Sequence, residues 1–308
     1  MAKYVLKRVL MALFTIFLVA TLTFFLMKAV PGNPFVSEKT PPQSVLDALN
    51  EKYGLDQPLS VQYFKYMSNL LRGDLGVSVK MQKNYPVISI IKEMFPVSAK
   101  IGAFALLWAV LVGVPLGCLA AYNRGTATDS TLRVVCTVGI SMPSFVVASL
   151  LLIVFCGGVV GWFPSIFDGS PRSYVLPCFS LGFYPMCYIA RQSRAAMLDA
   201  INQEYIKTAR AKGLKTGKII FKHALRNALI PVLTYLGPQV AFTLCGGFVV
   251  EKVFTIGGRY FVQSVSNRDY PVIMGTTIFL ASFIIIMNLL VDILYKVVDP
   301  RITLGKES

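Results

Sequence analysis

The feature that most constrains this chain is a set of six long apolar stretches separated by more polar segments. They lie at about residues 9–30, 98–122, 134–160, 174–190, 228–250 and 272–295. A helix rises about 1.5 Å per residue, so roughly 20 apolar residues cross a hydrocarbon core of about 30 Å. The stretches are continuous rather than alternating, which argues against a membrane β-barrel. The sequence therefore predicts an all-α integral membrane protein with six transmembrane helices.

Lys and Arg are distributed unevenly between the two sides that this pattern defines. With the N-terminus inside, the inner segments hold 17 of them and the outer segments hold 11. The inner segments are 1–8, 123–133, 191–227 and 296–308, and the outer ones are 31–97, 161–173 and 251–271. Because Lys and Arg favour the cytoplasmic side, we expect both termini inside the cell. The net charge of +15 is then a matter of topology, and no nucleic-acid partner is predicted.

The first apolar stretch resembles a secretory signal peptide in one respect, because Lys3, Lys7 and Arg8 precede it. However, its run Val9–Met27 is 19 residues long, whereas the apolar region of a signal peptide is usually about 7–15. We therefore expect residues 1–30 to form a retained first transmembrane helix.

Residues 31–97 form the largest segment outside the membrane. Its pattern predicts a short helix at Ser44–Tyr53 stopped by Gly54, and a second helix at Pro58–Leu71. These residues fit either a small folded cap or a long loop. The remaining expected parts are a membrane core at 98–298, which includes the loop 191–227, and a cytoplasmic tail at 299–308.

Glycine and proline interrupt two of the apolar stretches. Gly113, Pro115 and Gly117 lie in the second stretch, and Ser141-Met142-Pro143 lies in the third. Such residues are tolerated in membrane helices where neighbouring helices pack closely or satisfy the backbone. They predict kinks or close helix packing, and they would also suit hinges on which a bundle opens.

Ionisable and reactive residues are scarce inside the apolar stretches. Asp292, one turn after Asn288, is the only acid well inside one of them, and we expect it to pair with a neighbouring helix rather than to relay protons. The six cysteines include no Cys-x-x-Cys pair and are expected to be packing residues. With one histidine and no Walker or hydrolase motif, the sequence predicts no catalytic, cofactor or metal site in this chain.

The polar stretch Arg191–Asn227 is the most informative inner segment, with nine Lys and Arg residues against two acids. Its pattern predicts a short helix with Asn202 as the N-cap and with Ile201 and Ile206 as a hydrophobic staple. The helix should stop at Gly213, because the position after a helix often needs a positive φ.

A second helix is expected to begin at Thr216 and to enter the membrane at Ala228. Small residues in the first helix would let another surface approach closely; they are Thr208, Ala209 and Ala211. On physical grounds alone, the stretch also fits a solvated helix attracted to anionic lipid.

Two runs in this stretch resemble a known motif. Thr208-Ala209-Arg210-Ala211-Lys212-Gly213 and His223-Ala224-Leu225-Arg226-Asn227-Ala228 are similar to the peptide-branch form of the EAA motif of binding-protein-dependent ABC importer permeases. The resemblance also covers Lys7–Leu10, Val30–Pro34, Asn267–Gly275, Asp292–Tyr295 and Asp299–Ile302. The chain therefore resembles the B-type permease subunit of dipeptide/oligopeptide ABC importers, a group whose close relatives carry nickel chelates or glutathione.

The resemblance implies a coupling helix that docks into a cytoplasmic ATPase subunit. Its residues here would be Tyr205, Thr208, Ala209, Arg210, Ala211, Lys212, Gly213 and Leu214, with His223, Arg226 and Asn227 in the second helix of the loop. The implied partners are a homologous second permease subunit, two cytoplasmic ATPase subunits, an extracytoplasmic solute-binding protein and a peptide substrate. The implied location is the bacterial plasma membrane, crossed several times.

The chain departs from the family pattern at three places, two of which narrow the expected substrate class. Lys207 stands where the general motif begins with Glu, and Arg226 stands at the later Pro; both fit the peptide branch. Phe254–Arg259 is shorter than the matching loop of relatives, which leaves the shape of this loop open. Two other classes are weighed: an ion-coupled secondary transporter, which would need intramembrane ion ligands or inverted repeats, and a membrane scaffold whose basic loop binds lipid.

Overall fold

The computed structural model describes residues 2–30, 51, 54–157, 160–214, 219–245, 247–257 and 259–298. Within these ranges the regular structure is helical, and one isolated bridge pairs Val77 with Pro86. The chain divides into two compact units, which are described separately. The first unit comprises Met1–Pro96 and Gly257–Ser308, and the second comprises Val97–Ile256.

The helices confirm an all-α membrane protein. Four are long and apolar enough to cross a membrane: Leu6–Ala29, Val87–Tyr122, Leu225–Val253 and Tyr270–Ile293. A fifth span results if the bent pair Ala127–Ser141 and Ser144–Cys156 is taken as one. The predicted span 174–190 lies inside α7 (Pro171–Ile201), a longer and more polar helix, so the full six-span topology stays a prediction.

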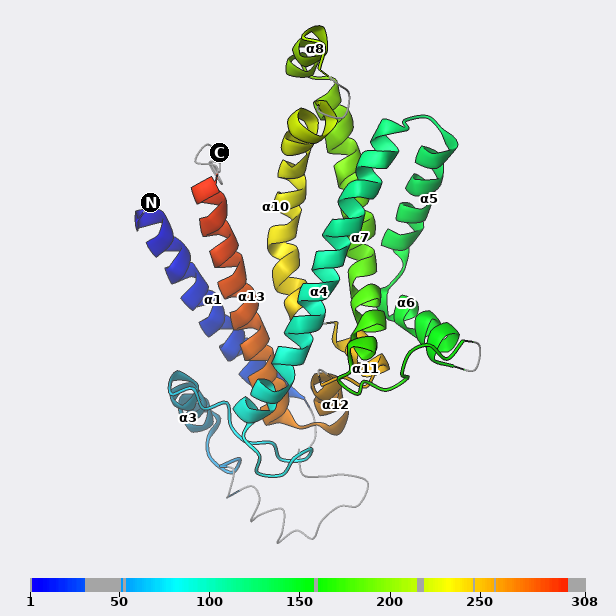
Figure 1. Ribbon diagram of the computed structural model, residues 1–308. Coiled ribbons are helices and arrows are strands. Elements are labelled where there is room, and N and C mark those ends of the chain that lie inside the picture. The colour runs from blue at the N-terminus through cyan, green and yellow to red at the C-terminus, as the bar shows by residue number, and fades with distance from the viewer. Residues whose placement is uncertain are drawn as a thin grey trace. The chain divides into compact units, whose positions relative to one another are not determined.

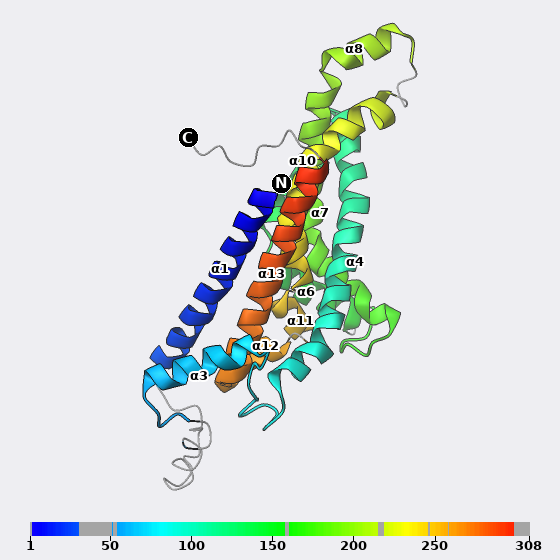
Figure 2. The same ribbon diagram turned by 90° about the vertical axis from the view of Figure 1, so that its left-hand side faces the viewer.

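In the first unit, α1 (Ala2–Ala29) and α13 (Tyr270–Val298) pack side by side (Figures 1 and 2). Arg8 Nη1 on α1 lies 2.7 Å from Asp292 Oδ2 on α13. The expected pairing of Asp292 with a neighbouring helix is therefore confirmed. Since both helices contribute one charge, the pair reduces the cost of placing each charge inside an apolar segment.

Helix α3 (Leu59–Leu71) runs crosswise to α1 at the C-terminal end of that helix (Figure 2). It confirms the helix predicted at Pro58–Leu71, and the chain leaves it through Gly73, whose φ is +78°. Aromatic rings fasten it to α1, because Phe24 contacts both Tyr63 and Tyr66 with ring centroids 5.3–5.4 Å apart. The helix predicted at Ser44–Tyr53 lies almost entirely outside the described residues.

A buried carboxylate ties the loop before α4 to the turn between α12 (Arg259–Asn267) and α13. Asp269 is fully buried, and its carboxylate accepts hydrogen bonds from Ser78 Oγ at 2.6 Å and from three consecutive backbone N–H groups at 3.0–3.1 Å. Those N–H groups belong to Val79, Lys80 and Met81. The carboxylate thus holds a loop that lies about 190 residues away in the sequence.

In the second unit, α4 (Val87–Tyr122) packs against α7 with almost no side chain between the two backbones. A Cβ added at Gly117 of α4 would lie 2.3 Å from the carbonyl oxygen of Ala190, and one at Gly113 would lie 2.7 Å from that of Met186. A Cβ added at Gly182 of α7 would likewise lie 2.5 Å from the carbonyl oxygen of Ala105 on α4. The predicted alternative of close packing is therefore confirmed for these glycines, and α4 continues through Pro115 as one helix.

The third apolar stretch is broken rather than straight. Helix α5 (Ala127–Ser141) ends at Met142, whose φ and ψ of −85° and 123° are extended, and α6 (Ser144–Leu151) begins after Pro143. The bend between the two helical segments is 102°. Proline disfavours the helical conformation of the residue before it, which explains the break. The expected kink at Ser141-Met142-Pro143 is confirmed, and whether the bent pair forms the single span expected over 134–160 stays a prediction.

An ion pair fastens the start of α5 to α7. Arg194 contacts the buried carboxylate of Asp129 with both Nε, at 2.6 Å, and Nη2, at 2.9 Å. The backbone N–H of Gly125 donates a third hydrogen bond at 3.1 Å. Arg194 belongs to the basic stretch 191–227, so at least one of the basic residues there serves internal packing. The six cysteines are unpaired and four are buried, as predicted for packing residues.

Candidate functional site

Helix α8 (Glu204–Ala211) lies at one end of the second unit, beyond the end of α7 (Figure 1). One face holds it there, because Ile206 is fully buried and Ala209 is 6% exposed in a cluster of apolar side chains. The cluster also contains Met197 and Ala200 of α7 and Ala228 of α10 (Leu225–Leu244). The short helix is therefore seated on the end of one membrane helix and on the start of another.

The end of α8 has the geometry that the sequence predicts. Gly213 has a φ of +70°, and the backbone N–H of Leu214 donates to the carbonyl of Ala209 at 3.3 Å. This is the long bond of a Schellman motif, and Leu214 packs against the same apolar cluster. No atom lies within 4 Å of a Cβ added at Gly213, so the glycine is needed there for its backbone conformation rather than for space.

The start of α8 differs from the prediction. Asn202 is the C-cap of α7, with φ and ψ of −85° and −3°, rather than the N-cap of α8. The first N–H groups of the new helix, those of Ile206 and Lys207, bond instead to the carbonyl of Gln203. Asn202 is still completing the preceding helix, because the turn between the two helices is only two residues long.

The second half of the loop contacts α8 directly. Asn227 Nδ2 donates a hydrogen bond to the hydroxyl of Tyr205 at 2.8 Å, which joins two residues of the predicted site. Arg226 is exposed. A π-helical turn, Ile219–Ala224, leads without a break into α10, as expected for a second helix. The structure does not describe Thr216, where the second helix was predicted to start. It also does not describe the side chains of Arg210 and His223.

The face of α8 opposite its buried side is exposed. Glu204, Thr208 and Ala211 recur at intervals of four and three residues and share this face. Lys207 pairs with Glu204 at 2.6 Å, but an exposed pair of this kind contributes little to stability. Of the three small residues predicted to meet a partner, Thr208 and Ala211 are accessible, whereas Ala209 is buried and packs inward. Lys212 is exposed just beyond the helix.

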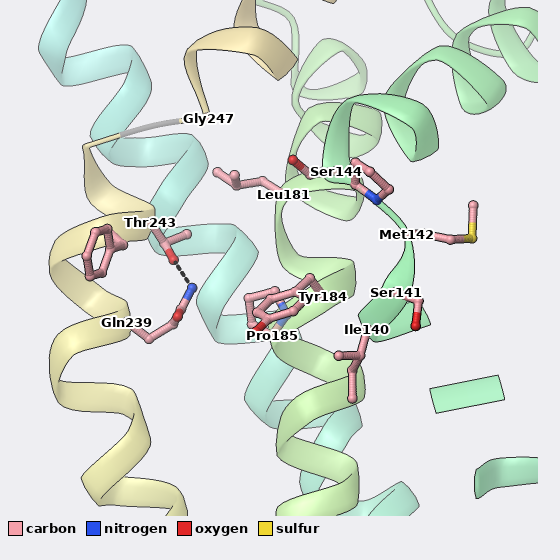
Figure 3. Close-up of a pocket in the computed structure, with 12 residues that line it drawn as sticks. Ile140, Ser141, Met142, Ser144, Leu181, Tyr184, Pro185, Gln239, Thr243 and Gly247 are labelled. Carbon is pink, nitrogen blue, oxygen red and sulfur yellow. Dashed lines mark hydrogen bonds between the residues drawn. The ribbon is translucent and has the colours of Figure 1, made fainter. Parts of the chain in front are cut away.

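A pocket of about 450 Å³ lies between α5, α6, α7 and α10 (Figure 3). It opens where α5 gives way to α6, beside Pro185 of α7 and next to Gly247, which precedes α11 (Phe248–Val253). The pocket is therefore bordered by two helix breaks, one between α5 and α6 and one between α10 and α11. Among the described residues its lining has no charged side chain, and its polar side chains are Ser141, Ser144, Tyr184, Gln239 and Thr243.

The pocket surface can exchange hydrogen bonds with a neutral polar molecule. Gln239 Nε2 donates to Thr243 Oγ1 at 3.0 Å, and both side chains come from α10 (Figure 3). This pocket was not among the sites predicted from the sequence, since its lining comes from four separate segments. The Ser141-Met142-Pro143 signal, which predicted the break, was the part of it that could be seen in the sequence.

Comparison with known families identifies the chain. Residues 113–304 match the binding-protein-dependent transport system inner membrane component, and residues 1–101 match the N-terminal part of the corresponding membrane component. The chain belongs to this family. As an inner membrane component with several membrane-spanning helices, it is a multi-pass protein of the plasma membrane.

Relatives of this inner membrane component match along their whole length. It is 44% identical over 310 residues to the dipeptide transport system permease protein DppB of Bacillus subtilis, and the match covers 100% of both chains. It is 42% identical over 306 residues to the oligopeptide transport system permease protein OppB of Haemophilus influenzae, covering 98% of this chain and 99% of that one. The DppB of Lactococcus lactis is 40% identical over 306 residues, covering 99% and 100%.

Proposed function

We propose that this permease is one of two membrane subunits of an ATP-driven importer of di- and oligopeptides. The observation that carries the proposal is the arrangement of α8, which has one face buried at the end of the second unit and the other face exposed, with the small residues Thr208 and Ala211 on it. A partner helix groove can approach such a face closely. The names of the relatives, which are dipeptide and oligopeptide permeases, support peptide as the substrate class.

In this proposal the chain crosses the membrane six times with both termini inside, and α8 lies in the cytoplasm. A homologous permease completes the translocation pathway, two ATPase subunits bind below, and a solute-binding protein delivers peptide from outside. ATP is hydrolysed on the ATPase subunits, because the permease contributes contact surfaces rather than catalysis. When the ATPase subunits move on binding or hydrolysing ATP, they displace α8. This displacement is passed to α7 and α10 through the apolar cluster around Ile206 and through the hydrogen bond between Tyr205 and Asn227.

We further assign the pocket at the α5–α6 break as this subunit's share of the peptide pathway. Peptides of different sequence share only their backbone amides and their termini. An uncharged surface carrying Ser, Tyr, Gln and Thr side chains can bond to amides without selecting side chains, which suits a pathway for varied peptides.

Substitution on the exposed face of α8 tests the coupling role. We expect Thr208→Trp to lower ATP-dependent peptide uptake at least tenfold, because an indole would block close approach of the ATPase while the buried face stays intact. The measurement is uptake of a labelled dipeptide into proteoliposomes, together with co-purification of the ATPase subunits. Thr128→Trp is the matched control, since Thr128 is also exposed but lies on α5. Normal uptake and normal ATPase retention in Thr208→Trp would exclude α8 as the coupling element.

Filling the pocket tests the pathway separately. We expect Ser141→Trp to reduce peptide uptake at least tenfold while ATPase subunits still co-purify, because the indole would enter the 450 Å³ space at the α5–α6 break and narrow it. Val138→Trp is the control; Val138 is exposed on the same helix and does not line the pocket. If Ser141→Trp transports peptide as fast as the unmodified protein, the pathway lies elsewhere.

A further inference from the structure

A second pocket, of about 220 Å³, lies in the first unit between the C-terminal end of α1, helix α3 and the start of α13. The proposed transport function does not use it. Its polar lining includes two amines, Lys28 and Lys65, and two phenols, Tyr66 and Tyr270. Among the residues that the structure describes, no carboxylate lines it. A pocket with this lining offers hydrogen-bond donors and positive charge to a ligand.

The two lysines differ in how they are held. Lys28 Nζ donates to the side-chain oxygen of Gln62 and lies 5.8 Å from the centre of the Phe24 ring, which fixes the amine at the pocket wall. Lys65 has no ion pair within the part of the chain that the structure describes. Lys65 is exposed, and its Nζ lies 3.6 Å from a Cβ placed on Gly54, another lining residue, so the amine lies at the mouth of the pocket where a ligand can reach it.

The two phenols have free hydrogen-bonding capacity at the pocket. The hydroxyl oxygens of Tyr66 and Tyr270 are buried, and neither has a hydrogen-bond partner among the described residues. Buried polar atoms are nearly always bonded, so an unbonded pair that lines one pocket calls for an explanation. Phenol O–H groups and ammonium groups are all donors, and the ligand that satisfies them together is an anion with several acceptor oxygens, such as a phosphate group.

The surroundings of the pocket identify the source of that phosphate. Lys28 marks the end of the apolar helix α1, where a membrane–water boundary is expected. Helix α3 crosses this end and exposes Phe64 and Leu71, which are 70% and 87% exposed and seven residues apart on one face. A crosswise helix with exposed apolar side chains is typical of one that lies in the interfacial layer of a bilayer.

We propose that this pocket binds the phosphate-bearing headgroup of an anionic phospholipid from the leaflet at this end of α1. Lys28 and Lys65 supply the charge, and the hydroxyls of Tyr66 and Tyr270 complete the hydrogen bonds to the phosphate oxygens. Apolar lining residues, including Met27 and Met274, contact the glycerol and the first carbons of the chains. The lipid would thereby join α1, α3 and α13.

Lipid titration of the full-length permease, purified with its partner subunits in detergent, tests the proposal. The probes are mixed micelles containing phosphatidylglycerol, matched micelles containing phosphatidylcholine, and inorganic phosphate without lipid. We expect retention of phosphatidylglycerol, counted by native mass spectrometry, and we expect the double variant Lys65→Gln/Tyr66→Phe to weaken its apparent affinity at least tenfold. Lys252→Gln, which removes an exposed cation on α11, should leave the affinity unchanged.

Unfolding temperatures distinguish binding from a packing defect. In phosphatidylcholine, Tyr66→Phe and Tyr270→Phe should be at least as stable as the unmodified protein, because each removes an unbonded buried hydroxyl. In phosphatidylglycerol the two Phe variants should instead unfold at a lower temperature than the unmodified protein, because they bind the lipid less tightly. Unchanged phosphatidylglycerol affinity in the double variant, or no reversal, would overturn the site. Equal stabilisation by inorganic phosphate at the same concentration would overturn the lipid as its source.

Discussion

Replacing Asp269 by alanine should destabilise the first unit by about 3 kcal/mol or more. Hydrogen bonds to a charged group contribute about 1.5–3 kcal/mol each, and this carboxylate accepts four of them in a fully buried position. The substitution would leave the N–H groups of Val79, Lys80 and Met81 without their acceptor. The measurement is the free energy of unfolding in mixed micelles, together with hydrogen exchange of those three amides, which should accelerate.

A neighbouring acid provides the control for Asp269. Asp74 is exposed and accepts one hydrogen bond, from the N–H of Gly76 at 2.8 Å, so Asp74→Ala should cost about 1 kcal/mol or less. The loss of stability in Asp269→Asn should lie between those of Asp269→Ala and Asp74→Ala. The asparagine amide keeps one acceptor oxygen, but its NH₂ group places two donors next to other donors. Equal stability of Asp269→Ala and Asp74→Ala would show that the buried carboxylate does not organise this unit.

Replacing Ile206 by aspartate should almost abolish peptide uptake while leaving the membrane helices folded. Ile206 is fully buried in the cluster that seats α8, and burying an unpaired carboxylate there costs several kcal/mol. Since α8 is short, we expect it to detach rather than to accept this cost. Uptake should then fall about a hundredfold, measured in proteoliposomes containing equal amounts of permease.

Two variants separate this effect from charge and from general instability. Gln203→Asp adds the same charge at an exposed position before α8, where the helix dipole favours it, and should retain uptake. Ile206→Leu keeps an apolar side chain of equal size and should retain nearly all of the peptide uptake. The interpretation of α8 as a seated coupling helix fails if Ile206→Asp transports peptide at the normal rate.

Local signals in the sequence predicted local structure well. Gly213 was correctly placed at the end of α8, because a left-handed residue after a helix depends on a few neighbouring residues. The break at Met142 followed from Pro143 in the same way. The predicted N-cap at Asn202 is wrong: asparagine is a favourable N-cap residue, but the preceding helix α7 ends only at this position.

Contacts between residues far apart in the chain could not be predicted from the sequence. The pocket at the α5–α6 break draws its lining from Ile140 to Gly247, and the acceptor for Ser78 lies 191 residues away at Asp269. Arg194 was grouped with the other basic residues of its stretch, although it is committed to Asp129. Neither spacing nor composition identifies such partners, because they depend on which helices become neighbours.

The glycine contacts between α4 and α7 have a mechanical consequence. Contacts at Ala105, Gly113 and Gly117 extend over about 18 Å of α4, and each brings one helix backbone against the other. Sliding α4 along α7 would drive larger side chains into these contacts, so the two helices move as a single rigid body. Rotation about the two breaks, at Met142 and near Gly247, would then change the width of the pocket while the α4–α7 pair keeps its own geometry.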